Sequence, residues 1–285
     1  MRQTLIYCLL SIPILVMAGW FYLDKRNVKK RKWKRITLQA QPLPAEYLHI
    51  LQAEFPLYSR LPDELQQKLA GHIQVFLDEK DILGRGGFEI TNTVRVLIAA
   101  QACTLILNRP GNYYPGFRSI LVYPETYVAN STHRDGMLQV TATSTRAGES
   151  WQRGPVILAW DHVLQGARDS RDGHNVVMHE FAHKLDEENA AMDGLPLLPT
   201  AGQYKQWSEV LSAEFGIQQQ KLADGDEDVI DSYGATSPAE FFAVVTETFF
   251  EKPYQLEHHH PQLYAQFKQC YLLDPKDWCD IKHPR

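Results

Sequence analysis

The sequence has few cysteines, and they form no recognisable pattern. Its 285 residues include four, Cys8, Cys103, Cys270 and Cys279, and no two of them have CxxC spacing. A disulfide framework and a cysteine-based zinc knuckle are therefore not indicated, which agrees with a reducing compartment. The sequence also shows no internal repeat.

Basic residues are scarce outside the first 35 residues. That segment holds nine of the 29 Lys and Arg residues but one of the 34 Asp and Glu residues, which leaves 20 basic and 33 acidic residues in 36–285. A body with such an acidic excess is not expected to bind nucleic acid directly. The basic cluster at 25–35 could sit on anionic lipid head groups, although its simpler role is to set membrane topology.

Long apolar runs are missing except at the N-terminus. Thr4–Leu23 is a run of twenty residues without a charge, long enough to cross a bilayer as a helix. Only Arg2 precedes it and the basic cluster follows, so the positive-inside rule predicts an uncleaved single-pass anchor in the inner (cytoplasmic) membrane. A cleaved signal peptide would have a shorter apolar core after its basic residues. We expect an anchor with its basic cluster over 1–35, a cytoplasmic domain over 36–273 and a tail over 274–285.

The domain shows helical patterns on both sides of a β-rich region. Thr91 and Ser237 can cap helices, and Pro238 suits a first helical position. The run at 155–160 could be an edge strand that pairs with an extended peptide, or an interior strand. We predict a mostly helical α+β fold with a small mixed sheet, in which helices cover 62–77, 94–107, 204–215, 238–252 and 261–271 and strands cover 119–123, 137–143 and 155–160.

The segment HEFAH at 179–183 carries the strongest functional signal. A helix places residues four apart on one face, so His179 and His183 can bind one metal ion with Glu180 beside them, as in zinc peptidases. Gly173–Asp186 has the apolar residues for such a helix, and Asp172 can cap it. The alternative is a pair of core histidines that share a helix face and bind no metal.

A catalytic zinc ion usually has three protein ligands and an open position for water. A histidine six residues after His183 is excluded, because that position is Asn189. The third ligand should then be a distant carboxylate, and we choose Glu240 because it lies in the first turn of a helix at the edge of the core. It also matches a capping box with Ser237. The residues alone leave open the other candidates on predicted helices, which are Glu209, Glu214, Glu247 and Glu251.

Three segments together resemble the Mlc titration factor A family of zinc peptidases, whose metal core is similar to that of anthrax lethal factor. They are WxxGPVIL at 151–158, HEFAHKLD at 179–186 and YGATSPAEFF at 233–242. The resemblance extends from roughly residue 60 to residue 273. It implies a zincin-like fold in which His179, His183 and Glu240 bind one Zn²⁺ ion, Glu180 is the general base and Tyr233 lies at the site.

The resemblance implies hydrolysis of peptide bonds by a zinc-activated water, with Tyr233 stabilising the oxyanion. It also suggests aminopeptidase action, which needs a carboxylate for the free amine, and Glu187, Glu188 or any of several other acidic residues could serve. The alternative function is a regulatory module that sequesters a glucose-responsive transcriptional repressor. The expected partners are thus a peptide or protein substrate, this repressor and the inner membrane.

Two further features are expected to be structural. Asp186, three residues after His183, is expected to be a carboxylate at the helix end rather than an acceptor for a ligand imidazole. The run His258, His259 and His260 is expected to lie in a solvated loop rather than to form a second metal site.

Overall fold

The computed structural model describes residues 21, 23, 25–109, 113–125, 127–135, 138–146, 148–150 and 154–279. The chain divides into two compact units, with the boundary between Pro42 and Leu43. In the first unit, a helix over 25–39 carries largely exposed basic side chains. The span expected at Thr4–Leu23 lies outside the described residues apart from Phe21 and Leu23. Helices in the described part all fall short of the length and apolarity that a bilayer crossing requires.

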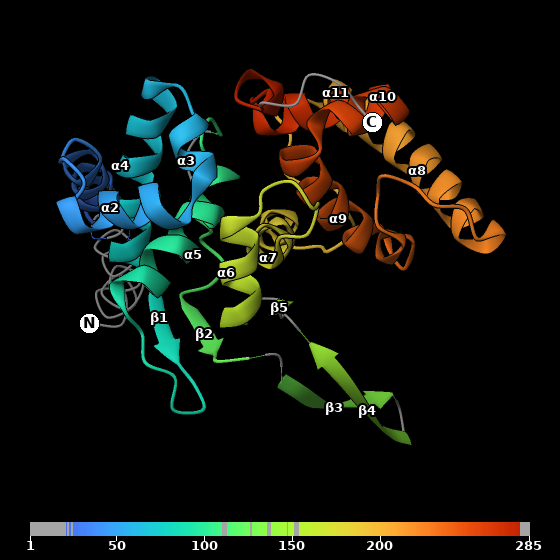
Figure 1. Cartoon of the computed structure of the whole chain (residues 1–285), viewed down its shortest axis with the longest axis horizontal. Coiled ribbons are helices and arrows are strands. Elements are labelled where there is room, and N and C mark those ends of the chain that lie inside the picture. Colours follow the sequence, from blue (N-terminus) through green and yellow to red (C-terminus); the bar gives the residue numbers. More distant parts are fainter. Residues whose placement is uncertain are drawn as a thin grey trace, which may run out of the picture. The chain divides into compact units, whose positions relative to one another are not determined.

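The second unit is mostly helical. Its helices are α2 (Ala45–Glu54), α3 (Pro56–Arg60), α4 (Asp63–Glu79), α5 (Asn92–Thr104), α6 (Trp160–Arg168), α7 (Val176–Asp186), α8 (Ala201–Asp224), α9 (Pro238–Glu251), α10 (Pro253–His259) and α11 (Pro261–Tyr271), with 3₁₀ turns η1 (Glu187–Asn189), η2 (Ser232–Ala235) and η3 (Pro275–Asp277) (Figure 1). The predicted helices are present. The helix predicted over 204–215 extends to Asp224, where Gly225, with a φ of 76°, forms its left-handed cap.

A small mixed sheet precedes α6 and contains the strands predicted over 119–123 and 155–160, whereas the strand predicted over 137–143 belongs to a separate pair. Its strands are β1 (Asp81–Gly84), β2 (Ser119–Tyr123), β6 (Val156–Ala159) and β5 (Gly148–Ser150), in the order β1-β2-β6-β5. The first three are parallel and β5 is antiparallel to β6. The edge-strand interpretation of 155–160 is wrong, because β6 has a partner on each side, and the strand at that edge is β5. A separate antiparallel pair consists of β3 (Tyr127–Asp135) and β4 (Leu138–Arg146).

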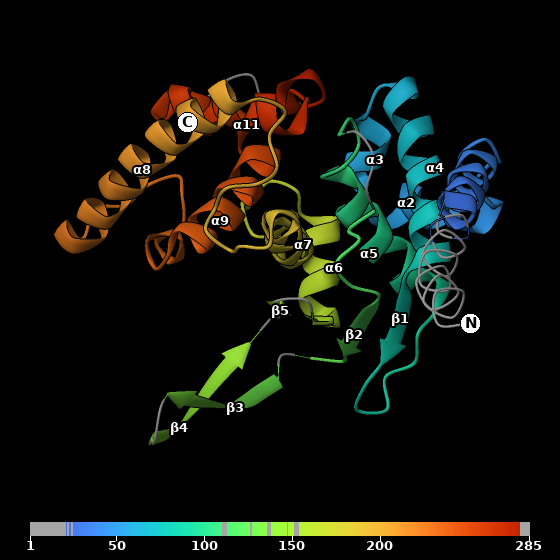
Figure 2. The same ribbon diagram turned by 180° about the vertical axis from the view of Figure 1, so that it is seen from behind.

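Helix α7 is held on two sides by packed elements. It contacts α5, α6, β5 and β6, and also α9, and both ribbon views place it between α6 and α9 (Figures 1 and 2). On the α5 side, the buried ring of Phe181 packs against Phe76, Tyr114 and Phe117 with centroids 4.8–5.7 Å apart. Close packing of this kind resists displacement. The backbone of α7 is therefore a rigid support for His179 and His183.

The three consecutive histidines do not lie in a solvated loop. His258 and His259 are exposed residues at the end of α10, whereas His260 is buried. The Nδ1 atom of His260 is 2.7 Å from Glu214 Oε2, and its Nε2 atom is 3.0 Å from Asp228 Oδ2. Burial lowers the pKa of His260, but its hydrogen bonds to the two carboxylates outweigh burial and raise it to about 9. The expectation of solvent exposure was wrong for His260, because a charged histidine can be buried when both ring nitrogens are paired.

Candidate metal centre

Helix α7 starts at Val176, three residues later than the sequence suggested. Its cap is Asn175, whose Oδ1 atom accepts a hydrogen bond of 2.9 Å from the Met178 N–H. Asp172, the predicted cap, accepts instead from the N–H of His174 at 2.8 Å. Asn175 is preferred because its backbone is extended, as an N-cap requires, directly before the first helical residue. The expected helix around the HEFAH segment is confirmed.

The first turn of α9 brings a carboxylate to this helix. Ser237 Oγ accepts a hydrogen bond of 3.2 Å from the Glu240 N–H, and Pro238 occupies the first helical position, as predicted. The backbone of Glu240 therefore belongs to the helix cap, while its side chain reaches the two histidines. Its Oε2 atom is 3.0 Å from His179 Nε2 and 3.3 Å from His183 Nε2.

These three side chains can hold one metal ion. Their candidate ligand atoms all lie within 4.8 Å of one another. Ligand atoms at zinc bond lengths in a tetrahedron are roughly 3.3 Å apart, which agrees with the spacing between Glu240 and each histidine. Two imidazoles and one carboxylate also form a donor set that suits zinc. Within the described ranges, this is the one group of His, Cys, Asp or Glu side chains with such geometry.

The other candidate third ligands point elsewhere. Glu209 is exposed and lies 3.8 Å from Lys205, and Glu214 faces His260. Glu247 is buried and contacts the far side of a ligand ring: its Oε1 atom is 2.8 Å from His179 Nδ1. A carboxylate at this position accepts the Nδ1–H and leaves Nε2 with its lone pair for a metal. Glu247 therefore orients His179.

Glu251 continues the same arrangement one turn further along α9. Its two oxygens accept hydrogen bonds from Asn175 Nδ2 at 3.1 Å and from the Gly173 N–H at 3.0 Å. The backbone N–H of Asn175 in turn donates to Glu247. The carboxylates of α9 therefore fix the cap of α7 as well as His179. Burial and the nearby charges of Asp172 and Glu247 raise the pKa of Glu251 well above its usual value.

Sequence reasoning did not recognise this second role of α9, although a signal existed. Glu240, Glu247 and Glu251 are separated by seven and four residues, so they lie on one stripe of a helix. The rest of α9 is apolar except for Thr246 and Thr248, and it is largely buried. Three glutamates on one stripe of such a helix indicate a shared buried partner, which here is the start of α7 with His179.

The charges in this cluster stabilise one another. Burial lowers the pKa of His179, but Glu247 and Glu240 outweigh it and raise the pKa well above its usual value. Burial raises the pKa of Glu240, whereas the hydrogen bonds from His179 and His183 bring it well below its usual value. Glu240 is therefore ionised at neutral pH, as a metal ligand must be.

Two further site residues predicted from the resemblance lie next to this cluster. Glu180 is buried on α7, and its charge contributes to the raised pKa of His179. Tyr233 belongs to η2, is 54% exposed, and has its ring centroid 6.1 Å from that of His179. Asp231 accepts a hydrogen bond of 2.7 Å from the Tyr233 N–H and thereby holds this turn.

The remaining acids after His183 have structural partners. The Asp186 carboxylate accepts hydrogen bonds from the N–H groups of Gly194 at 2.8 Å and Leu195 at 2.9 Å, so it is a helix-end group that holds the next loop, as expected. Burial raises its pKa to about 6. Glu187 pairs with Lys184 at 3.0 Å, and Glu188 lies 3.8 Å from Arg109.

Known proteins match this chain over most of its length. The sequence model of the glucose-regulated metallopeptidase family M90 matches residues 28–272. An uncharacterised protein of Synechocystis is 43% identical over 245 residues, which are 85% of this chain and 89% of the relative. Mlc titration factor A of Cronobacter sakazakii is 34% identical over 253 residues (86% and 92%), and that of Escherichia fergusonii is 34% identical over 226 residues (77% and 83%).

The family match includes the helix with His179 and His183 and the helix with Glu240. The resemblance inferred from three short segments is therefore confirmed by similarity over most of the chain. This similarity, which agrees with the His–His–Glu cluster, shows that the chain belongs to the glucose-regulated metallopeptidase family M90.

Proposed function

We propose that the protein is a zinc-dependent peptidase that uses His179, His183 and Glu240 as metal ligands. The observation that carries this proposal is the convergence of three ligand atoms, with Glu240 Oε2 3.0 Å and 3.3 Å from the two Nε2 atoms. The family assignment supports the same chemistry. Glu247 supports it as well, because a carboxylate that accepts from Nδ1 orients the His179 ring with its Nε2 atom towards Glu240, where Nε2 can bind a metal after losing its proton.

The chain's own residues supply the proton transfers of the proposed mechanism. When bound, zinc supplies a Lewis acid that lowers the pKa of water and polarises the peptide carbonyl. Glu180 takes the proton from the attacking water and returns it to the leaving amine. The Tyr233 phenol donates a hydrogen bond to the oxyanion that develops on the carbonyl oxygen. Its exposure on η2 leaves it accessible to a substrate.

We further propose aminopeptidase-like action. An aminopeptidase needs a carboxylate that binds the free amine of the substrate. Both oxygens of Glu187 lie 3.0 Å from Lys184, whereas Glu188 lies 3.8 Å from Arg109. A longer ion pair is weaker, so Glu188 is the better candidate. Acetylation of a substrate's N-terminus should therefore abolish its cleavage, and equal cleavage of the acetylated peptide would indicate an endopeptidase.

A second candidate function is binding of a transcriptional repressor. The relatives from Cronobacter sakazakii and Escherichia fergusonii carry the name Mlc titration factor A, which favours a repressor as a partner of this chain. Such sequestration does not require cleavage. The acidic excess of residues 36–285 makes direct binding to nucleic acid unfavourable. In this reading the protein would act on transcription through a protein partner.

One substitution separates the two candidates. Glu180→Gln keeps the size of the side chain but removes the base. If peptide cleavage and the protein's effect on transcription in the cell are lost together, the peptidase function is supported. If cleavage is lost while repressor binding and the cellular effect persist, the binding function is supported. Retention of full cleavage by this variant would refute the assigned role of Glu180.

We also propose that residues 4–23 anchor the protein in the inner membrane, with the metal centre in the cytoplasm. The support is the sequence: twenty residues without a charge are followed by the basic cluster at 25–35. The exposed basic side chains of the helix over 25–39 can contact anionic lipid head groups.

A further inference from the structure

The connector between α8 and η2, residues 225–231, is held by one side of α8. Gln218 and Lys221 are three residues apart, so they lie on the same side of this helix. Lys221 Nζ donates a hydrogen bond of 2.8 Å to Asp228 Oδ2. Gln218 Nε2 donates one of 2.9 Å to the Ile230 carbonyl. The connector is therefore fixed to α8 at two points.

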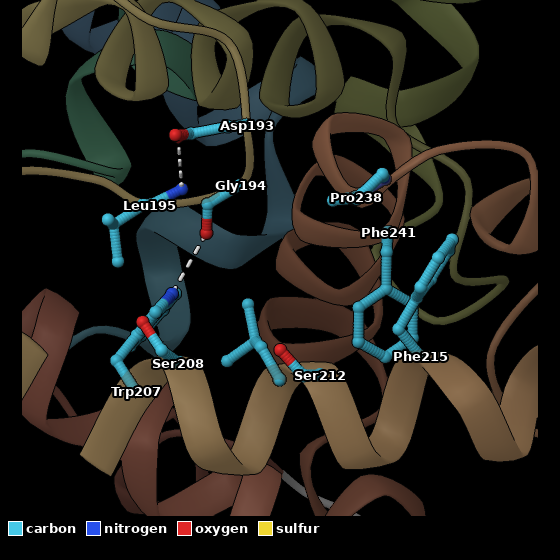
Figure 3. A pocket seen from close by; sticks show the side chains of 10 residues that line it. Asp193, Gly194, Leu195, Trp207, Ser208, Ser212, Phe215, Pro238 and Phe241 are labelled. Carbon is cyan, nitrogen blue, oxygen red and sulfur yellow. Dashed lines mark hydrogen bonds between the residues drawn. The ribbon is translucent and has the colours of Figure 1, made fainter. Parts of the chain in front are cut away.

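Helix α8 is itself fixed beside the first turn of α9. The buried Trp207 donates a hydrogen bond of 2.8 Å from Nε1 to the Gly194 carbonyl. The ring of Phe215 packs against Phe241 of α9, with centroids 5.7 Å apart. Figure 3 shows both contacts around a pocket between α8, the start of α9 and the loop at 193–195. Close packing of this kind resists displacement, so α8 can support the connector.

The connector leads directly into the turn that carries Tyr233. Ile230 is buried, and the next residue, Asp231, holds the turn. The Asp231 carboxylate accepts a hydrogen bond of 2.7 Å from the Tyr233 N–H, and its carbonyl accepts one of 3.0 Å from the Gly234 N–H. Gly234 packs against Ile230, since a Cβ atom added to it would lie 3.6 Å from Ile230 Cγ2. On this base the Tyr233 ring lies beside His179, with centroids 6.1 Å apart.

The side chain of Gln218 is buried but paired on one side only. It is 3% exposed, and its Nε2 atom donates to Ile230, whereas its Oε1 atom accepts no hydrogen bond from the residues that the structure describes. A buried polar atom without a partner costs free energy, and an apolar side chain would avoid this cost. The stability of α8 alone therefore does not explain a glutamine at this position. The bond to the Ile230 carbonyl is the contact that an apolar residue could not supply.

We propose that Gln218 is a positioning residue, which holds Tyr233 at the metal centre through the carbonyl of Ile230. The inference rests on the proposed role of Tyr233 in peptide hydrolysis. The phenol lies at the end of a long side chain on an exposed turn, so a small shift of the turn displaces the hydroxyl. A misplacement of about 1 Å at a reacting group can lower a rate about 100-fold. Loss of the bond should therefore weaken stabilisation of the oxyanion rather than binding of the substrate.

The first test compares Gln218→Met with Gln219→Met in the zinc-loaded full chain. Methionine is as long as glutamine but donates no hydrogen bond, and Gln219 is the next, exposed residue of α8. Gln218→Met should lower kcat for a peptide about tenfold and change KM less than about twofold. Gln219→Met should leave both constants unchanged. An unchanged kcat in Gln218→Met would overturn the inference.

Substitution of Tyr233 separates positioning from a general loss of stability. Tyr233→Phe removes the hydroxyl and should by itself lower kcat about 100–1,000-fold. In this background Gln218→Met should lower kcat by less than a further factor of about two, because no hydroxyl remains to be positioned. A further tenfold loss would overturn the inference, since Gln218 would then affect activity by another route.

Amide hydrogen exchange in the full chain separates this inference from the proposed function. The amides of Tyr233 and Gly234, which donate to Asp231, should exchange at least about tenfold faster in Gln218→Met than in wild type, while those of α9 keep their rates. This result supports the placement of Tyr233 by Gln218 even where wild-type protein cleaves no peptide, and the peptidase proposal alone then fails. Unchanged exchange of both amides, or equal acceleration in α9, would overturn the inference. Gln218→Asn, whose amide is one methylene shorter, replaces Gln218→Met in the same measurements if that variant does not fold.

Discussion

The contact between Glu247 and His179 gives a sharp test of how α9 supports the metal centre. Glu247 accepts one hydrogen bond from His179 Nδ1 and another from the Asn175 N–H. In Glu247→Gln a single carbonyl oxygen faces these two donors, and the amide N–H₂ opposes one of them. Loss of a carboxylate that orients a ligand histidine typically weakens metal binding about 10–100-fold, or about 1.4–2.8 kcal/mol. We expect zinc affinity to fall by this amount.

The matched control is Glu251→Gln, on the same stripe of α9. Glu251 is also buried and also accepts two hydrogen bonds, from Gly173 and Asn175, but it does not contact His179. Both variants should lose about 1–3 kcal/mol of unfolding free energy in the metal-free form, since each opposes a buried donor. Zinc affinity, measured by competition with a chelator of known affinity, should fall only in Glu247→Gln. Equal zinc affinities in the two variants would refute the orienting role.

Three further predictions concern other parts of the chain. His260→Gln should destabilise the protein by roughly 2–3 kcal/mol near pH 6. The folded pKa of His260, about 9, exceeds the unfolded value, so the stabilisation that the charged ring contributes is complete below about pH 6.5 and is lost as the pH rises through 9. Melting temperatures of both proteins from pH 5 to 10 test this. Phe249→Ala removes a fully buried ring that contacts Tyr264, Phe267 and Tyr271. It should lower the free energy of unfolding, measured with urea, by about 3–5 kcal/mol, whereas truncation of the exposed Ile217 should not. Deletion of residues 1–24 should move the protein from the membrane pellet to the supernatant, and retention in the pellet after a high-salt wash would contradict anchoring by this segment.

Local signals in the sequence were sufficient for most helices and for the two ligand histidines. Ser237 and Pro238 define the start of α9, and Pro261 defines the start of α11, because cap and first-turn preferences depend on adjacent residues only. The pairing of His179 with His183 follows from helical periodicity. Glu240 could not be chosen from periodicity, since several glutamates lie on suitable helices. Its position in the first turn of a helix favoured it, and the resemblance of the segment at 233–242 supported that choice. The structure places its carboxylate beside both histidines.

The features that sequence reasoning missed depend on contacts between distant residues. Strand β1 is only four residues long, and its pairing with β2 crosses more than thirty residues of chain. The burial of His260 depends on Glu214 and Asp228, which lie 46 and 32 residues away. The sequence predicted Asp172 as the cap of α7, because aspartate and asparagine both suit an N-cap. The helix starts after Asn175 instead, and this start depends on the hydrogen bonds that Gly173 and Asn175 donate to α9. Local patterns carry no information about such partners.

The carboxylates around His179 explain why stability and chemistry are coupled at this site. Glu180, Glu240, Glu247 and Glu251 come from two packed helices, and three of them are buried. Buried charges of one sign repel one another and are tolerated only when paired. Here the N–H groups of Gly173 and Asn175 pair with Glu251 and Glu247, and the rings of His179 and His183 pair with Glu240 and Glu247. A divalent cation bound at Glu240 would neutralise the remaining negative charge. The residues that bind the ion therefore also hold α7 against α9. A substitution that weakens metal binding should therefore also lower the stability of the metal-loaded protein, because any ligand that binds only the folded state contributes its binding free energy to folding.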